Sequence, residues 1–209
     1  MRLSAGGAAV ACAIAVASAR ATAQAPTGHE GHMAQMSAAP SAPVVRLLTP
    51  QPSFNDNKFV DQRGQATTLS EAIGSDKPVL VNFIFTTCTT ICPVMSAGMS
   101  QFLTNLGAQQ DSVRVLSISI DPEFDTVPAL RAYAERYHAP SSWRLLTGTP
   151  AGADAAQRAF GGYRGGKNNH APVTFVRAAA DAPWIALDGF SSAETLLHAS
   201  MGHLVPATP

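Results

Sequence analysis

This sequence of 209 residues has little charge and no surplus of either sign. Only 13% of its residues are Asp, Glu, Lys or Arg, and the 14 basic side chains equal the 14 acidic ones. A chain without a basic surplus has no electrostatic attraction for the phosphate backbone of a nucleic acid or for anionic lipid. We therefore expect no nucleic-acid partner.

The chain also lacks a strongly apolar run of the roughly 20 residues that a membrane-spanning helix needs. Residues 1–23 instead combine Arg2, an Ala-rich apolar stretch and two small-x-small sites, the second of which ends at Ala23. This pattern is typical of a secretory signal peptide. We expect an exported, periplasmic protein that is soluble after cleavage, and retention of this segment at the inner membrane is the alternative.

Cysteine is scarce as well: Cys12 lies in the predicted signal peptide, which leaves Cys88 and Cys92 in "VNFIFTTCTTICPVM". An exported chain keeps such a pair for a disulfide, a metal or both, because an oxidising compartment disfavours stray thiols. Neighbouring thiolates suit Cu(I) or zinc. A helix that begins at Pro93 would also lower the pKa of Cys92. Metal capture and redox chemistry both remain open at this point.

Residues 24–50 are rich in Ala, Pro, Ser and Gly without a sustained period, which predicts a flexible tether. The tether contains "HEGHMAQM", in which four side chains are candidate imidazole and thioether ligands for copper. They are His29, His32, Met33 and Met36. Incidental polar residues of a linker are the alternative interpretation.

Apolar runs then alternate with amphipathic segments. We expect strands in "KPVLVNFIFTT", "SVRVLSISI", "WRLLTG", "VTFVRA" and "PWIALDGF", with helices between and after them. This order predicts an α/β, thioredoxin-like fold with a central mixed sheet flanked by helices. A hairpin turned at Gly64 forms an N-terminal extension. We assign residues 51–204 to this domain and 205–209 to a tail.

Two sulfurs leave a copper ion under-coordinated, so a third ligand should come from a distant loop. His170 in "GKNNHAPVTFV" is the best candidate, because it precedes a strand expected beside the one that bears the cysteines. Two sulfurs and one nitrogen suit Cu(I), or Cu(II) with a further oxygen. A solvated loop histidine is the alternative.

The cysteine motif, "SISIDPEFDT" and a histidine before "VTFV" together resemble the Sco/SenC family of thioredoxin-fold copper chaperones. The resemblance implies that Cys88, Cys92 and His170 are copper ligands and that Asp121 lies near the metal. Asp121 as an ordinary turn carboxylate is the alternative. Family members deliver copper to the binuclear copper centre of cytochrome c oxidase, or reduce the cysteines of that centre. The implied partner is that oxidase subunit or another periplasmic copper protein.

The sequence departs from the family pattern in two places. Asn169 stands where the family usually has an aspartate before the ligand histidine. Pro172 with Thr174 and Phe175 resembles the element of thiol reductases in which a cis-proline flanks the redox cysteines. These departures favour a second hypothesis, a thiol-disulfide oxidoreductase without obligatory metal that reduces a partner disulfide. The more exposed of its two cysteines would attack, and the other would resolve. A thiol reductase is a further candidate partner.

Two further patterns stay open. Thr89 and Cys92 form a T-x-x-C arrangement, which is compatible with a thiol peroxidase. His198, Met201 and His203 follow the last predicted helix and could bind metal weakly, although a fraying helix end is the simpler interpretation.

Overall fold

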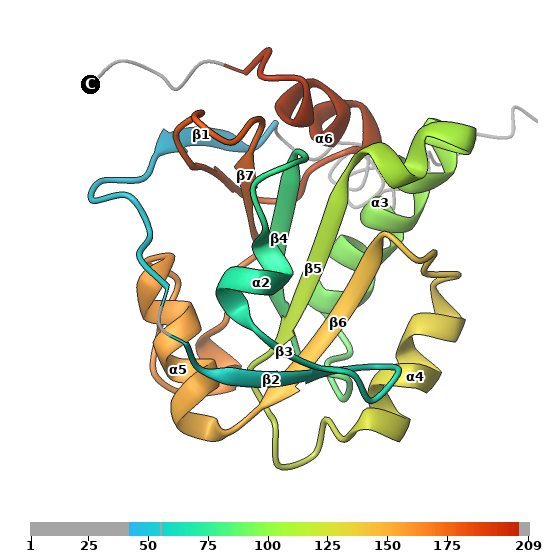
Figure 1. Ribbon diagram of the computed structural model, residues 1–209, viewed down its shortest axis with the longest axis vertical. Helices are drawn as coiled ribbons and strands as arrows, with labels where there is room; N and C mark the ends of the chain where they lie inside the picture. Colours follow the sequence, from blue (N-terminus) through green and yellow to red (C-terminus); the bar gives the residue numbers. More distant parts are fainter. Residues whose placement is uncertain (1–41, 55, 205–209) are drawn as a thin grey trace, which may run out of the picture. The chain divides into compact units, whose positions relative to one another are not determined.

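A single mixed sheet of eight strands organises the chain, in the order β1-β8-β7-β4-β5-β6-β2-β3 (Figure 1). The computed structural model describes residues 42–54 and 56–204. The strands are β1 (Val44–Leu47), β2 (Lys58–Asp61), β3 (Ala66–Thr68), β4 (Val79–Ile84), β5 (Arg114–Ser119), β6 (Trp143–Gly148), β7 (Val173–Arg177) and β8 (Ile185–Asp188). The helices are α2 (Leu69–Ile73), α3 (Ile91–Leu106), α4 (Val127–Arg136), α5 (Pro150–Ala159) and α6 (Ala193–Ser200), with 3-10 turns η1 (Gly107–Ser112) and η2 (Lys167–Asn169).

The centre of the sheet is parallel and its edges are antiparallel. β4 pairs in parallel with β5, and β5 with β6, whereas β7 and β8 continue the sheet antiparallel to β4. This arrangement confirms the predicted α/β, thioredoxin-like mixed sheet, and each strand expected from the sequence forms.

One strand was not expected. β1 pairs antiparallel with β8, from Val44 opposite Asp188 to Leu47 opposite Ile185. Residues 44–47 lie within the range assigned to a tether, so the folded part begins earlier than predicted. The "VVRL" run is only four residues long and does not alternate between apolar and polar side chains, so it carries no clear strand signal of its own. Its pairing partner, β8, lies about 140 residues later in the chain.

Side chains alternate between two cores, one on each face of the sheet. On one face, Leu80 and Ile84 of β4 pack with buried residues of α3, α4 and α6. On the other face, Val79, Val81 and Phe83 pack with buried residues of α2 and α5. Strand β4 is buried along its whole length because both faces are covered.

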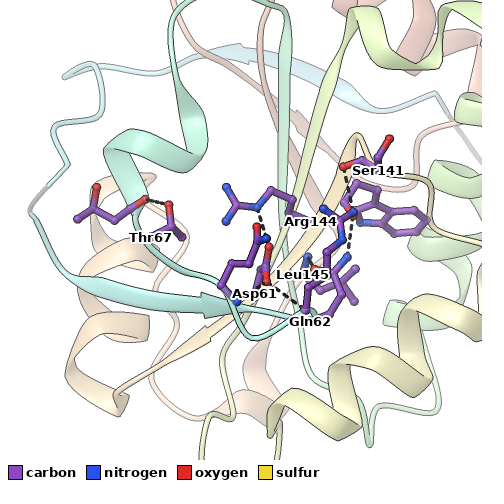
Figure 2. A network of polar contacts seen from close by, with 10 residues as sticks. Asp61, Gln62, Thr67, Ser141, Arg144 and Leu145 are labelled. Atoms are coloured by element: carbon purple, nitrogen blue, oxygen red, sulfur yellow. Dashed lines mark hydrogen bonds and ion pairs between the residues drawn. The ribbon is translucent and has the colours of Figure 1, made fainter.

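The β2–β3 hairpin is fastened to β6 by a buried polar network (Figure 2). One carboxylate oxygen of Asp61 accepts from the backbone N–H groups of Arg63 at 3.0 Å and Gln65 at 2.9 Å, which closes the turn. The other oxygen lies 3.2 Å from Nε of Arg144 on β6. The Gln62 side chain adds a further bond to β6, because its Oε1 accepts from the backbone N–H of Leu145 at 2.9 Å. The predicted hairpin with its turn at Gly64, which has a φ of 83°, is confirmed.

The predicted signal peptide and the four tether ligands, His29, His32, Met33 and Met36, lie outside the described residues. Among the residues described, no helix combines the length and apolarity that crossing a membrane would require.

Candidate metal centre

Cys88 lies in the loop that leads from β4 into α3. Its backbone N–H donates to the Phe85 carbonyl at 3.1 Å, and its sulfur accepts from the backbone N–H of Cys92 at 3.4 Å. Thr90 Oγ1 lies 3.8 Å from the same sulfur. Partial burial opposes ionisation of Cys88, but hydrogen bonds from Cys92 and Thr90 outweigh it and lower its pKa. Cys88 is therefore the readier thiolate of the pair.

Cys92 is the second residue of α3 and is fully buried. It belongs to the buried core on the α3 face of the sheet, together with Leu80, Ile84 and Met99. Burial, with a smaller contribution from its hydrogen bond to Cys88, raises the pKa of Cys92 to about 12. The expectation that the helix N-terminus lowers this pKa is wrong, because desolvation of a thiolate outweighs the helix-terminal field.

The helix start also differs from the prediction. Helix α3 begins at Ile91, so Pro93 is its third residue rather than its first. A proline is tolerated there because the N–H groups of the first turn have no partner within the helix. This start places Cys92 inside the helix and leaves Cys88 in the loop. The two cysteines are free thiols and form no disulfide with each other.

His170 follows η2 and leads into β7. Its ring nitrogen Nε2 is buried and has no hydrogen-bond partner within the described part of the chain. Burial lowers the pKa of His170, and a hydrogen bond with the Phe83 backbone opposes this only in part. The imidazole is therefore neutral at neutral pH, which is the form that binds metals. A buried, unpaired ring nitrogen is a natural position for a ligand, because an orphaned polar atom costs free energy.

Cys88 and His170 line one pocket of about 400 Å³. Its other lining residues are Phe85, Thr87, Thr89, Thr90, Ile91, Lys167 and Asn168. Within residues 42–54 and 56–204, however, no three His, Cys, Asp or Glu side chains stand close enough together to hold a metal ion. The fold thus brings the imidazole and the partly exposed thiol of Cys88 to one pocket, but within the described residues it does not assemble the three predicted ligands into a closed cage.

Asp121 is linked to this pocket by an ion pair with Lys167, a residue that was not predicted from the sequence. The Asp121 carboxylate is 8% exposed, and its Oδ2 lies 2.5 Å from Nζ of Lys167, which is in the pocket wall. The same ammonium lies 4.9 Å from the ring centre of Phe124 and 5.7 Å from that of Phe85. The ion pair joins the histidine loop to the turn after β5. A lysine three residues before the histidine was the only local signal of this contact.

Asp125, the second aspartate of "DPEFD", holds the cysteine loop and was not predicted from the sequence. It is fully buried, and its Oδ1 accepts from Thr86 through the backbone N–H at 3.0 Å and through the hydroxyl at 2.6 Å. Its Oδ2 accepts from the Ser119 hydroxyl at 2.6 Å. These bonds fix the start of the cysteine loop against the end of β5.

The structure shows what the two departures from the family pattern, Asn169 and Pro172, do in this chain. The Asn169 side chain donates to the Arg164 carbonyl at 3.3 Å, so it fastens its own loop. Among the described residues the one cis peptide bond joins Thr49 and Pro50, so the bond before Pro172 is trans and the cis-proline resemblance is wrong. The Pro172 carbonyl instead accepts from Gly189 at 2.8 Å, next to the β7–β8 ladder.

Comparison with known proteins identifies relatives of this fold and motif. The SCO1/SenC family model matches residues 49–178. The chain is 38% identical over 91 residues to the SCO1 protein homolog of Bacillus subtilis, which covers 43% of this chain and 46% of that protein. It is 30% identical over 118 residues to protein SenC of Rhodobacter capsulatus, or 56% of this chain and 52% of that protein. The chain spans about half the length of the curated relatives it matches.

Solved structures agree on the fold. One is BsSco, described as a member of the Sco family of cytochrome c oxidase assembly proteins with a disulfide switch. It has a TM-score of 0.55 and 26% identity over 66% of this chain and 83% of that one. Another is Bradyrhizobium japonicum ScoI with copper bound, with a TM-score of 0.58 and 23% identity over 72% of this chain and 96% of that one.

Proposed function

Since this chain belongs to the SCO1/SenC family, we propose that it is an exported copper-binding chaperone for the binuclear copper centre of cytochrome c oxidase. In this function Cys88, Cys92 and His170 hold the copper ion that is delivered. Two observations carry the proposal: Cys88 and His170 line the same pocket, and the buried Nε2 of His170 has no hydrogen-bond partner among the described residues.

The three ligands contribute differently to the proposed carrier. The cysteine loop is fixed, because Asp125 bonds Thr86 at its start and Cys88 accepts from the first turn of α3. His170 comes from a loop whose residues 164–166 and 168–169 are exposed. A carrier must release its cargo, and a third ligand on an exposed loop can exchange with an acceptor more readily than thiols on the fixed cysteine loop. We therefore assign capture to the thiols and control of release to the imidazole.

Copper titration tests this assignment. Reduced protein should bind one Cu(I) at the thiol pair, and His170→Ala should weaken that binding by about 100-fold or more, since even loss of outer partners of a ligand costs about 10- to 100-fold. His138→Asn is the matched control, because His138 lines a different pocket and its φ of 52° suits asparagine. Equal affinity of the wild type and His170→Ala would remove the histidine from the site.

A second candidate function is reduction of a partner disulfide, and the unequal thiols favour it. The Cys88 thiolate would attack one sulfur of the partner disulfide, forming a mixed disulfide and releasing the other partner sulfur as a thiolate. Cys92 would then lose its proton and displace the second partner sulfur, which leaves a Cys88–Cys92 disulfide. Two electrons pass to the partner, whose sulfurs take up two protons.

The acceptor distinguishes the two functions. The copper-centre domain of an oxidase, supplied with its cysteines reduced and without copper, should take copper from the loaded chaperone. The same domain supplied with its cysteines oxidised and with no copper present should be reduced only if the second function operates. We assign export to residues 1–23 and copper collection to His29, His32, Met33 and Met36 within the same proposal. Periplasmic fractionation, and copper binding by a variant without these four side chains, test those assignments.

A further inference from the structure

Helix α6 ends in an ordered motif rather than in a frayed turn. The backbone N–H of His203 donates to the His198 carbonyl at 2.9 Å, and that of Gly202 to the Ala199 carbonyl at 3.1 Å. Gly202 has a φ of 73°. This pair of nested hydrogen bonds around a left-handed glycine is the Schellman motif. The interpretation of a fraying helix end is therefore wrong.

The motif sets two imidazoles side by side. A Schellman motif brings the residue after the glycine back over the last helical turn, where an apolar contact usually forms. Here the two positions are His198 and His203, whose ring centres are 6.1 Å apart at an interplanar angle of 63°. Both residues are exposed, and between them Met201 is 57% exposed.

We propose that His198 and His203 form a second copper site, with the Met201 thioether as a third donor. A metal ion bound to a ring nitrogen at about 2 Å lies about 3 Å from the ring centre, so two rings on one ion have centres at most about 6 Å apart. The observed separation is at this limit, and a small rotation of one exposed side chain closes it. The helix C-terminus adds the negative end of its dipole, which favours a cation.

The donor set selects copper over other ions. Imidazole pairs bind Cu(II) more tightly than the other divalent first-row ions, and a thioether adds affinity for Cu(I). Calcium and magnesium prefer oxygen ligands, which this set does not supply.

The site is separate from the cysteine pocket. A Cβ built on Gly202 would lie 3.5 Å from Cβ of Ala178, which follows β7 where Arg177 pairs with Val79 at the start of β4. Cys88 follows the other end of β4, at a distance on the order of 20 Å along a strand of this length. The second site can therefore bind copper whether or not the cysteines do.

Broadening of histidine ring proton signals by paramagnetic Cu(II) tests the proposal. The experiment uses the full chain with Cys88→Ser, Cys92→Ser, His29→Ala and His32→Ala, so that neither the cysteine site nor the proposed copper-collecting histidines compete for the ion. The ring signals of His198 and His203 should broaden together at substoichiometric Cu(II). In His198→Ala the His203 signal should need about tenfold more Cu(II), and the reverse should hold for His203→Ala. If each ring broadens unchanged when the other is removed, the two do not share an ion and the proposal is wrong.

A backbone variant tests whether copper binding needs the Schellman motif itself or only the presence of the two imidazoles. Gly202→Ala keeps both imidazoles but forces an alanine into the left-handed region, so it should weaken Cu(II) binding at this pair. Gly107→Ala is the matched control, because Gly107 ends α3 at a φ of 53° with open space around its Cβ position and no histidine beside it. Equal Cu(II) affinity at His198 and His203 in both variants would show that the motif does not organise the site.

The role of the Met201 thioether is tested separately with Met201→Leu. Loss of affinity for Cu(I) but not for Cu(II) in this variant would support the thioether as third donor, and no loss for either ion would exclude it.

Discussion

The Nζ of Lys167 and the Oδ2 of Asp121 lie 2.5 Å apart, and this contact joins the histidine loop to the turn after β5. The lysine side chain is 35% exposed and the aspartate side chain 10%. The pair is thus better shielded from solvent than the Arg46–Asp188 pair between β1 and β8, whose side chains are 46% and 32% exposed.

A double-mutant cycle should detect this difference. We expect Lys167→Met and Asp121→Asn to show a coupling free energy of about 1–2 kcal/mol in urea denaturation, because the shielded aspartate loses its cation. The matched cycle of Arg46→Met with Asp188→Asn should give about 0.2–1 kcal/mol, as for exposed pairs. A coupling for Lys167 no larger than for Arg46 would mean that the loop is not held by this contact.

The two thiols should differ greatly in reactivity. With its pKa at about 12, Cys92 has a thiolate fraction of only about 1 in 10,000 at pH 8. Cys88 has a lowered pKa and is partly exposed, so alkylation by iodoacetamide should modify Cys88 first by a wide margin. Peptide mass spectrometry at short times checks the order. Cys88→Ser is the control, in which labelling of Cys92 should be as slow as global opening, and fast labelling there would contradict the burial of Cys92.

Tyr133 should make stability depend on pH above about 10. Its hydroxyl lies 2.8 Å from Ser96 Oγ, and burial raises its pKa above the ordinary value. At neutral pH, Tyr133→Phe should lower the free energy of unfolding by about 1 kcal/mol, since one buried hydrogen bond is lost.

The sign of the pH effect follows from linkage. A phenol with a raised pKa in the folded state contributes stability that is complete below its unfolded pKa of about 10 and is lost as pH rises above that value. The difference in unfolding free energy between the wild type and Tyr133→Phe should therefore shrink from about pH 10 upward. Chemical denaturation at several pH values measures it, and a constant difference would contradict the raised pKa.

The carboxylate of Asp61 should be a strong determinant of hairpin attachment. Asp61→Ala removes the acceptor for two turn N–H groups and the partner of Arg144, so we expect a loss of about 2–4 kcal/mol in the free energy of unfolding. Asp76→Ala is the control, because the Asp76 side chain is 61% exposed in its ion pair with Arg114, and its loss should lower the free energy of unfolding far less than loss of Asp61. Similar losses in the two variants would show that the network in Figure 2 does not anchor the hairpin.

The amino-acid sequence by itself determined most elements of the fold, all of the strands except β1, and which side chains are candidate ligands. Apolar runs such as "KPVLVNFIF" and the turn at Gly64 are local signals, because side-chain periodicity and backbone preference act between near neighbours in the chain. The position of the cysteine pair where a strand gives way to a helix follows from the same local patterns, with Cys88 in the loop and Cys92 in the first turn of α3. The place of His170 beside Cys88 came from the expected strand order and the family resemblance, and the shared pocket agrees with it.

Tertiary structure alone decided how the two thiols differ and what surrounds them. Cys92 has a raised pKa because side chains from β4 and α3 remove it from water, and the surroundings of a buried group cannot be seen in a short motif. Lys167 reaches Asp121 across 46 positions of sequence, and β1 finds its partner in β8 only when the sheet is complete. Burial and pairing between distant segments depend on the whole fold, and this dependence turns two similar cysteines into one partly exposed thiol with a lowered pKa and one buried thiol with a raised pKa.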